Sequence, residues 1–418
     1  MNALATFGFT LTARDTELVG SRRLADPLGL LPIWSRVARG LVPHLTAQTT
    51  RAAGFELLIA LLDAFERPEM EAVRQFVSRR EFFLIGEQIA AHAVAARARD
   101  KGWPLPGRRG FDRWAGAEDY PLSLQAAVLL DNQAAGGLWG LYRGAGGRAK
   151  LLDSALEAPE ESVAASLAAE GTRLDNQALK ELKTHVVAVT QSPERTVRPF
   201  SKASLRRSHL AEILAGLVHE LPNRALLRRR LFDDHPLLDG VAERLAEQPG
   251  NVDYSAFLSD CRSHFPERAD VFEDILRCER YIAVLDVAFE QLLAQSGQPV
   301  AVAGRALDID LRALDTARME FGSLGRHFKT GGIAARFGIL CNVNLSSETE
   351  FTNSLVEAHQ KVAGQRGSAH WVEVENGRIR RLVNADSLDA PDSRPQERLW
   401  RNDYYLSAVR SVYGEVRR

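Results

Sequence analysis

Cysteine is scarce in this chain, and its 418 residues contain only Cys261, Cys278 and Cys341. Three thiols cannot form a disulfide framework for a protein of this size, which indicates a reducing compartment. The densest apolar run, Phe55 to Phe65, is far shorter than the ~20 residues of a membrane span and contains two acids. The N-terminal sequence also lacks the basic start and apolar run of a signal peptide. We therefore expect a soluble, cytoplasmic protein.

Net charge and lysine are also low. The chain has 53 Lys and Arg against 54 Asp and Glu, so its formal net charge is −1 and gives no global attraction to nucleic acid or anionic lipid. Only seven of the basic residues are lysine, and the other 46 are arginine. Arginine suits bidentate contacts with phosphate and carboxylate. The preference is equally typical of a GC-rich bacterial genome, so the arginine count alone does not indicate DNA binding.

Hydrophobic spacing predicts a mainly α-helical protein. In Val271–Gln295 the apolar residues alternate steps of four and three, which places one apolar stripe along a single helix. The stripe is typical of burial against neighbouring helices, with a short coiled coil as the alternative. Apolar residues at helical spacing also predict two helices in residues 26–66, divided at Pro43 and ended at Pro68. Further helices are expected over residues 69–99 and 122–130, with an ordered loop between them at Trp103–Trp114.

The C-terminal part predicts a small α+β module. Phe337–Leu345 is rich in strand-forming residues, and Ser346–Glu350 is typical of a helix cap, with a helix running to about Val362. Asn376-Gly377 joins two alternating runs and predicts a β-hairpin, because both residues accept positive φ in a tight turn. A final helix is expected in residues 394–418.

Polar segments rich in proline or glycine suggest the domain boundaries. Arg143–Lys150 is interpreted as a loop, and Gln191–Ser201, with its two prolines, is the stronger candidate for a linker. The fold prediction is a multi-helix body with the small C-terminal module that contains the hairpin. The predicted domains are residues 1–190, 191–325 with the basic stretch, and 326–418.

Familiar catalytic and metal motifs are incomplete in this sequence. Gly144–Lys150 resembles a nucleotide-binding loop only in its glycines, since it lacks the spacer and the Lys-Ser/Thr pair. His219-Glu220 lacks the second histidine of a zinc-protease helix. Cys261 and His264 have zinc-like spacing, but Cys278 lies on the apolar stripe, so buried thiols are the favoured interpretation. We predict no catalytic residues, no metal and no cofactor.

A basic stretch over Arg195–Arg230 is the main candidate binding site. It contains nine Lys and Arg against Glu212 and Glu220, a local balance of +7. Such a density suits contacts with nucleic-acid phosphates. The alternative is a solvated helix face, or pairing within the chain with Asp233, Asp234 and the acid-rich residues 267–279. The candidate nucleic-acid-binding residues are Lys202, Arg206, Arg207, Arg224, Arg228, Arg229 and Arg230.

A second, weaker candidate lies in residues 326–336. Arg326, Lys329 and Arg336 surround Gly331-Gly332, and backbone amides of a glycine-rich turn beside basic side chains can hold an anion. The alternative is a hinge into the C-terminal module.

Two passages together carry a resemblance to a known group of proteins. They are residues 26–66 (DPLGLLPIWSRVARGLVPHLTAQTTRAAGFELLIALLDAFE) and residues 353–410, with EAHQKVAGQRGSAHWVEVENGRI followed by WRNDYYLSAVR. This arrangement resembles uncharacterised helical proteins encoded beside helicases, nucleases or ATPases in bacterial phage-defence islands. The resemblance covers about a quarter of the chain and contains no catalytic signature. It implies an accessory role in antiviral defence.

These observations favour binding and assembly over catalysis. The first hypothesis is a non-enzymatic subunit of a bacterial multi-protein assembly in phage defence, whose helical faces bind partner proteins and whose basic stretch touches DNA or RNA backbone. The partners implied are a helicase, a nuclease or an ATPase, with no membrane. The alternatives are an enzyme whose site is assembled from dispersed residues and a pure protein–protein scaffold.

Overall fold

The computed structural model describes residues 26–97, 105–107, 112, 119–383, 394 and 396–417. The chain is mainly helical, as predicted, with two small antiparallel sheets of two strands each in the part that is described. It divides into two compact units. Unit 1 comprises residues 1–41 and 252–404, and unit 2 comprises residues 42–251 and 405–418. The predicted domain boundaries at 190 and 325 fall inside these units rather than between them.

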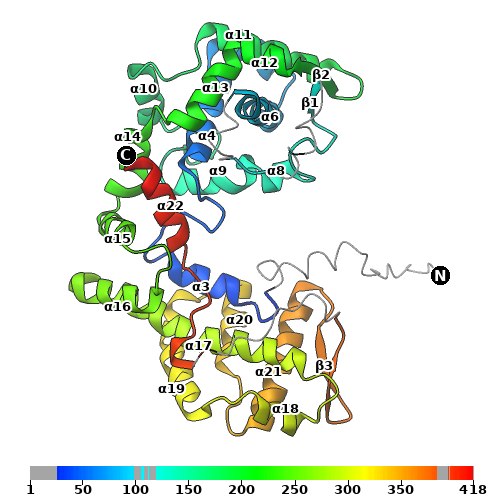
Figure 1. The fold of residues 1–418 in the computed structure, drawn as a ribbon, viewed down its shortest axis with the longest axis vertical. Helices are drawn as coiled ribbons and strands as arrows, with labels where there is room; N and C mark the ends of the chain where they lie inside the picture. The colour runs from blue at the N-terminus through cyan, green and yellow to red at the C-terminus, as the bar shows by residue number, and fades with distance from the viewer. Residues whose placement is uncertain are drawn as a thin grey trace, which may run out of the picture. The chain divides into compact units, whose positions relative to one another are not determined.

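Unit 1 is organised on one long helix (Figure 1). Its elements are α3 (Leu30–Ala38), α16 (Tyr254–His264), a 3-10 turn (Pro266–Arg268), α17 (Ala269–Ala294), α18 (Val300–Ala306), α19 (Leu311–Gly322), a 3-10 turn (Ser323–His327), α20 (Gly331–Cys341), α21 (Glu348–Arg366), β3 (Val372–Glu375), β4 (Arg378–Arg381) and a 3-10 turn (Gln396–Arg398). Helix α17 packs against α3, α16, α19 and α21. It confirms the long helix predicted from the apolar stripe, and Cys278 is buried on it.

Several other predictions for unit 1 are also confirmed. Ser347 caps α21 by accepting from the backbone N–H of Glu350, as the cap signature indicated. Strands β3 and β4 form the predicted hairpin, with Asn376 and Gly377 at φ 50° and 71° in the turn. The strand expected over Phe337–Leu345 is wrong. Residues 331–341 form α20, where Phe337 packs on Phe321 and Phe328, so tertiary packing overrides the local strand preference.

Unit 2 is built around the buried helix α4. Its elements are α4 (Ala52–Glu66), a 3-10 turn (Pro68–Met70), α5 (Glu71–Arg74), α6 (Arg79–Arg97), β1 (Asp119–Ser123), α8 (Gln133–Gly136), α9 (Leu138–Arg148), α10 (Glu161–Ala169), α11 (Asn176–Gln191), β2 (Thr196–Ser201), α12 (Lys202–Arg207), α13 (His209–Glu220), α14 (Arg224–Arg228), a π-helical turn (Arg229–Asp233), α15 (Pro236–Ala246) and α22 (Leu406–Val416). All residues of α4 except Glu66 are buried. Helices α6, α9 and α13 pack directly against it.

Three predictions for unit 2 are wrong. Gln191–Ser201 is not a linker, because residues 196–201 form β2 and pair with β1, where Pro199 is tolerated in a two-stranded sheet. The helix expected over residues 122–130 is replaced by the end of β1 and turns. Arg143–Lys150 is not a loop, because most of it belongs to α9. The loop expected at Trp103–Trp114 lies mostly outside the described residues.

Helix boundaries differ from expectation in two places. The helix expected over residues 69–99 is interrupted at residues 75–78, between α5 and α6. The C-terminal helix is confined to Leu406–Val416. Tyr404 and Tyr405, at φ 47° and 66°, turn the chain just before it.

A buried carboxylate fixes the segment that precedes α22. Glu279 of α17 is fully buried and accepts from the backbone N–H groups of Arg401 and Asn402, from Asn402 Nδ2 and from the Tyr404 hydroxyl. Burial raises the pKa of Glu279, and these donors oppose that rise. One side chain on the long helix therefore satisfies four polar groups of a segment more than 120 residues later.

Replacing Glu279 with alanine should strongly destabilise unit 1. Buried donors on Arg401, Asn402 and Tyr404 would lose their acceptor, at an expected cost of about 3–5 kcal/mol in the free energy of unfolding. Tyr404→Phe removes one of these donors and should cost about 1 kcal/mol. Urea unfolding of both variants checks this ranking, and equal costs for the two would contradict it.

A second buried carboxyl lies in unit 2. Oε1 of Glu56 accepts from the backbone N–H and the side-chain Nδ2 of Asn223, and Thr172 Oγ1 donates to Asn223 Oδ1 at 2.6 Å. Oε2 of Glu56 is buried without a hydrogen-bond partner among the described residues. Burial raises the pKa of Glu56 to about 7. Burial likewise raises the pKa of Glu87, on α6, to about 7.

These two carboxyls predict a loss of stability as the pH rises. A folded-state pKa of about 7 lies above the ordinary glutamate pKa of 4.5, so each carboxyl stabilises the fold fully below pH 4.5 and loses that effect as the pH rises through 7. Between pH 5 and pH 8 the two carboxyls together should lower the free energy of unfolding, and Glu56→Gln should remove about half of that loss. The half that Glu56 contributes is on the order of 3 kcal/mol. Urea unfolding across this range measures the slope, and an unchanged slope in Glu56→Gln would exclude Glu56 as its source.

Candidate nucleic-acid interface

The predicted basic stretch is divided by the fold into two groups on different helices. Lys202, Arg206 and Arg207 belong to the short helix α12, which follows β2 directly. The second group lies on α14 and the π-helical turn after it, and contains Arg224, Arg228, Arg229 and Arg230. The two groups have different surroundings and are described separately.

Helix α12 is joined to α6 by two arginines that exchange hydrogen bonds across their helix ends. Arg97, the last residue of α6, donates through Nε to the Leu205 carbonyl at 3.1 Å and through Nη2 to the Ser208 carbonyl at 3.0 Å. Arg206 of α12 donates in return through Nε to the Ala96 carbonyl at 3.2 Å. The last carbonyls of a helix have no partner within the helix, so each arginine satisfies the end of the other helix.

This exchange gathers four cations at one place on unit 2, which we call the basic corner: Arg97, Lys202, Arg206 and Arg207. Lys202 and Arg207 are exposed. Three acids lie beside the corner: Glu212, whose carboxylate lies 3.7 Å from Arg97, Asp119, which is opposite Ser201 in the sheet, and Glu181, which accepts from Ser208 Oγ at 2.8 Å. The four cations of the corner therefore outnumber these three acids by one.

The second group is largely engaged inside unit 2. Arg228 forms ion pairs with Asp233 at 3.0 Å and Asp239 at 2.7 Å, and its guanidinium lies 4.5 Å from the centre of the Tyr413 ring. Arg230 pairs with Glu160 at 3.1 Å and with Asp234 at 3.3 Å. These contacts match the alternative of internal pairing. Arg229 is exposed.

Arg224 also has an internal partner, since it donates to the Glu220 carbonyl at the end of α13 at 3.3 Å.

The weaker anion-site candidate includes one arginine that is paired with a buried carboxylate. Arg326 donates to both carboxylate oxygens of the buried Asp274, and His327 contacts the same carboxylate at 2.7 Å. The side chain of Arg336 lies close to Gly29, on another element of unit 1. Lys329 is exposed. Of these three cations, Arg326 is thus bonded to a carboxylate of the protein.

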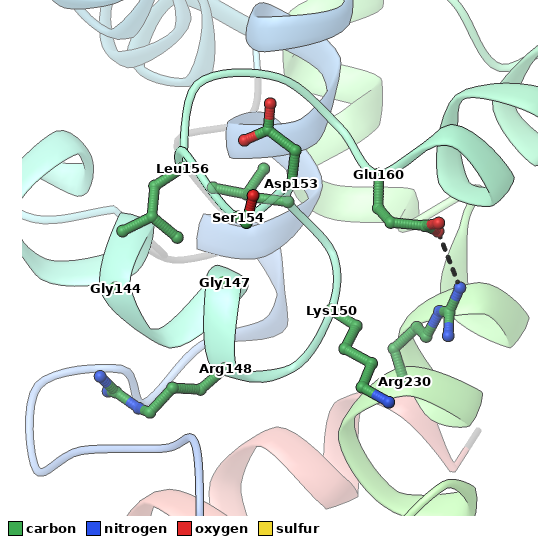
Figure 2. A pocket seen from close by; sticks show the side chains of 10 residues that line it. Gly144, Gly147, Arg148, Lys150, Asp153, Ser154, Leu156, Glu160 and Arg230 are labelled. Atoms are coloured by element: carbon green, nitrogen blue, oxygen red, sulfur yellow. Dashed lines mark hydrogen bonds and ion pairs between the residues drawn. The ribbon is translucent and has the colours of Figure 1, made fainter.

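The glycines that resembled a nucleotide-binding loop serve helix packing. A Cβ on Gly147 would lie 2.0 Å from Leu156 Cδ2, and one on Gly146 would lie 3.1 Å from Leu58 Cδ2. The end of α9 therefore requires small residues where residues 151–156 and α4 approach it. A hollow of about 570 Å³ lies beside this end of α9 (Figure 2).

The buried polar groups were not found from the sequence, because nothing in the local pattern distinguishes them. Glu87 accepts from the backbone N–H of Leu138 at 2.7 Å and from Gln133 Nε2 at 2.8 Å. His92 contacts the Pro121 carbonyl, and burial lowers its pKa to about 4. Each of these groups joins two elements of unit 2. Within the described residues, no group of three or more His, Cys, Asp or Glu is arranged to hold a metal ion.

No described helix combines the length and the apolar character that crossing a membrane requires.

Comparison with known proteins identifies no relative: no family model matches the chain, and neither the curated proteins nor the solved structures contain a match.

The ion pairs of Arg228 with Asp233 and Asp239 predict that replacing Arg228 and replacing Arg229 have different effects on stability. Arg228→Ala breaks two ion pairs and an aromatic contact and leaves Asp239 short of its cation, so we expect a loss of about 2 kcal/mol. Arg229→Ala changes an exposed side chain and should alter stability by less than about 0.5 kcal/mol. Thermal unfolding of the two variants compares them directly. Equal effects would mean that the ion pairs of Arg228 contribute little.

Proposed function

We propose that this chain is a non-catalytic subunit of a bacterial, cytoplasmic multi-protein assembly, and that its basic corner binds the backbone of DNA or RNA. The observation that carries the proposal is the exchange between Arg97 and Arg206, which fixes α12 so that Lys202 and Arg207 remain exposed beside it. Phosphate contacts of this kind position a nucleic acid without reading its sequence. The expected binding is therefore non-specific and dependent on salt.

The assembly part of the proposal rests on the resemblance to proteins of phage-defence islands. In that setting the partners are a helicase, a nuclease or an ATPase, which supplies the chemistry. The buried carboxylate of Glu279 accepts from four donors of the protein itself, which agrees with a structural role for this group.

The double variant Lys202→Glu/Arg207→Glu tests the basic corner. Each lost phosphate contact reduces the slope of log K against log salt by about 0.9 for duplex DNA, so we expect a reduction of about 1.8 together with weaker binding. Fluorescence anisotropy with labelled duplex DNA, single-stranded DNA and RNA measures both quantities.

A matched control separates the corner from general electrostatics. Arg268→Glu/Arg312→Glu makes the same change in net charge at two exposed arginines of unit 1. This control should keep the wild-type slope. Equal losses in both double variants, or no nucleic-acid binding by the wild type at low salt, would refute the proposal, and the latter result would favour a pure protein–protein scaffold.

A further inference from the structure

The hairpin of β3 and β4 has one paired edge and one open edge. Beyond β4, residues 297–300 continue the sheet, because the Ile379 N–H donates to the Gln298 carbonyl at 2.9 Å and the Gly297 N–H donates to the Ile379 carbonyl at 2.7 Å. Figure 1 shows the hairpin at the edge of unit 1, beside α21 and α18. The edge that the described residues leave open is therefore the one formed by β3.

Val374 lies at this open edge. It is opposite Ile379, and since Ile379 directs its amide and carbonyl away from β3, the antiparallel pattern directs those of Val374 away from β4. Outside the hairpin, no described residue forms a hydrogen bond to either group. The Val374 side chain shares a face with the buried Val372 and Ile379, yet Val374 is 37% exposed. An added strand would bond this edge and cover Val374.

One segment of the same chain has the sequence pattern of such a strand. Residues 5–12 (ATFGFTLT), which lie outside the described residues, alternate apolar residues with threonine or glycine. The apolar members are Ala5, Phe7, Phe9 and Leu11. This alternation is typical of a strand with one buried face. The apolar side chains of such a strand would extend the buried face of the hairpin over Val374.

The chain enters the described part of unit 1 beside the start of β3. His359 of α21 donates through Nδ1 to the Pro27 carbonyl at 2.8 Å and accepts through Nε2 from the backbone N–H of Trp371 at 2.7 Å. Trp371 directly precedes β3. Arg366 donates to the carbonyl and to the carboxylate of Asp26, both at 2.6 Å. These bonds fix the start of the link to residues 5–12 next to β3.

The link is long enough to reach the whole edge. Residues 13–25 separate the segment from Asp26, and a chain of that length spans at most about 43 Å when it is extended. Strand β3 has four residues and is about 13 Å long. An antiparallel arrangement places residue 12 near the start of β3, where Asp26 is held, and so needs the shorter link.

We propose that residues 5–12 of this chain add to β3 as a third, antiparallel strand and cover the Val374 side chain. The apolar residues are then opposite Val372 and Val374, and the threonines and glycine are opposite Glu373 and Glu375. Phe9, near the centre of the segment, exchanges backbone hydrogen bonds with β3. The proposal concerns unit 1 alone and is independent of the basic corner, which belongs to unit 2.

Cysteine cross-linking of the full chain tests the pairing. Thr10→Cys/Glu373→Cys and Gly8→Cys/Glu373→Cys cover the two central registers. Both carry Cys341→Ser, so that the native thiols that remain are buried. We expect one of the two pairs to form an intramolecular disulfide under mild oxidation, because directly opposite residues of neighbouring strands bring their Cβ atoms within disulfide distance.

Thr16→Cys/Glu373→Cys, in the same background, is the matched control. Thr16 is closer in sequence to Asp26, so attachment alone would favour its cross-link over that of Thr10. With the proposed pairing, the control should form its disulfide at least tenfold more slowly than the faster of the two test pairs.

Hydrogen exchange at the Val374 amide gives a second readout that needs no cysteine. Phe9→Pro removes a backbone donor from the added strand and should raise the exchange rate of Val374 at least tenfold. The Ile379 amide, which is bonded to Gln298, is the internal control and should be unchanged. Asp15→Pro, outside the segment, should leave both amides as in the wild type.

Four results would overturn the proposal. They are a control that cross-links as fast as the test pairs, a disulfide that forms only between two molecules, free exchange of the Val374 amide in the wild type, and protection of that amide that persists in Phe9→Pro. The second result would assign the edge to the segment of another copy of this chain, and the fourth would assign it to a different occupant.

Discussion

The ends of the helices impose the main constraint on this fold, because buried carbonyls at a helix C-terminus need donors that the helix cannot supply. In the part of the chain that is described, several arginines donate to carbonyls at helix C-termini. They include Arg74 at the end of α4, Arg97 at α12, Arg206 at α6, Arg224 at α13, Arg318 at α20 and Arg381 at α17. A guanidinium offers five donors in a fixed fork and stays charged at every physiological pH. The arginine-rich composition therefore has a structural use, whatever its genomic origin.

Carboxylates have the complementary role at helix N-termini. Glu87 accepts from the first N–H of α9, Glu415 from the first N–H of α4, and Asp26 from the first two of α3. The positive end of the helix dipole favours an anion at each of these places. Where burial is complete and no cation lies nearby, as at Glu87, desolvation still raises the pKa. The same contacts that join the helices thus make the stability of the fold sensitive to pH.

The sequence predicts the parts of this structure that depend on local pattern. The stripe of α17, the Ser347 cap and the Asn376-Gly377 turn each follow from spacing or backbone preference within a few residues. Helix α9 was missed because its glycines signal a loop, whereas distant residues such as Leu58 require them to be small. The strand β2 was missed because its pairing with β1 joins segments about 80 residues apart.

The candidate site shows the same limit. A local balance of +7 over residues 195–230 was visible in the sequence, and so were the neighbouring partners Asp233 and Asp234. The partners Glu160, Asp239 and Tyr413 were not predicted, because no local pattern links them to these cations. The domain organisation was equally inaccessible, because each unit is assembled from two separate stretches of chain. Contacts between distant segments have no signature in a single sequence.

Phosphate binding and helix capping compete for the same arginine donors, so cation density alone is a poor measure of affinity for nucleic acid. Arg228 and Arg230 are held by carboxylates of the protein, and a phosphate would have to displace those carboxylates at a cost in stability. Arg97 and Arg206 each use donors in hydrogen bonds to carbonyls of the protein. The negative oxygens of those carbonyls also lower the positive electrostatic potential at this place. Lys202 and Arg207 are exposed and can neutralise a phosphate without breaking the fold. Any backbone binding by unit 2 should therefore depend on very few contacts, with a shallow salt dependence and an affinity that relies on the other subunits of an assembly.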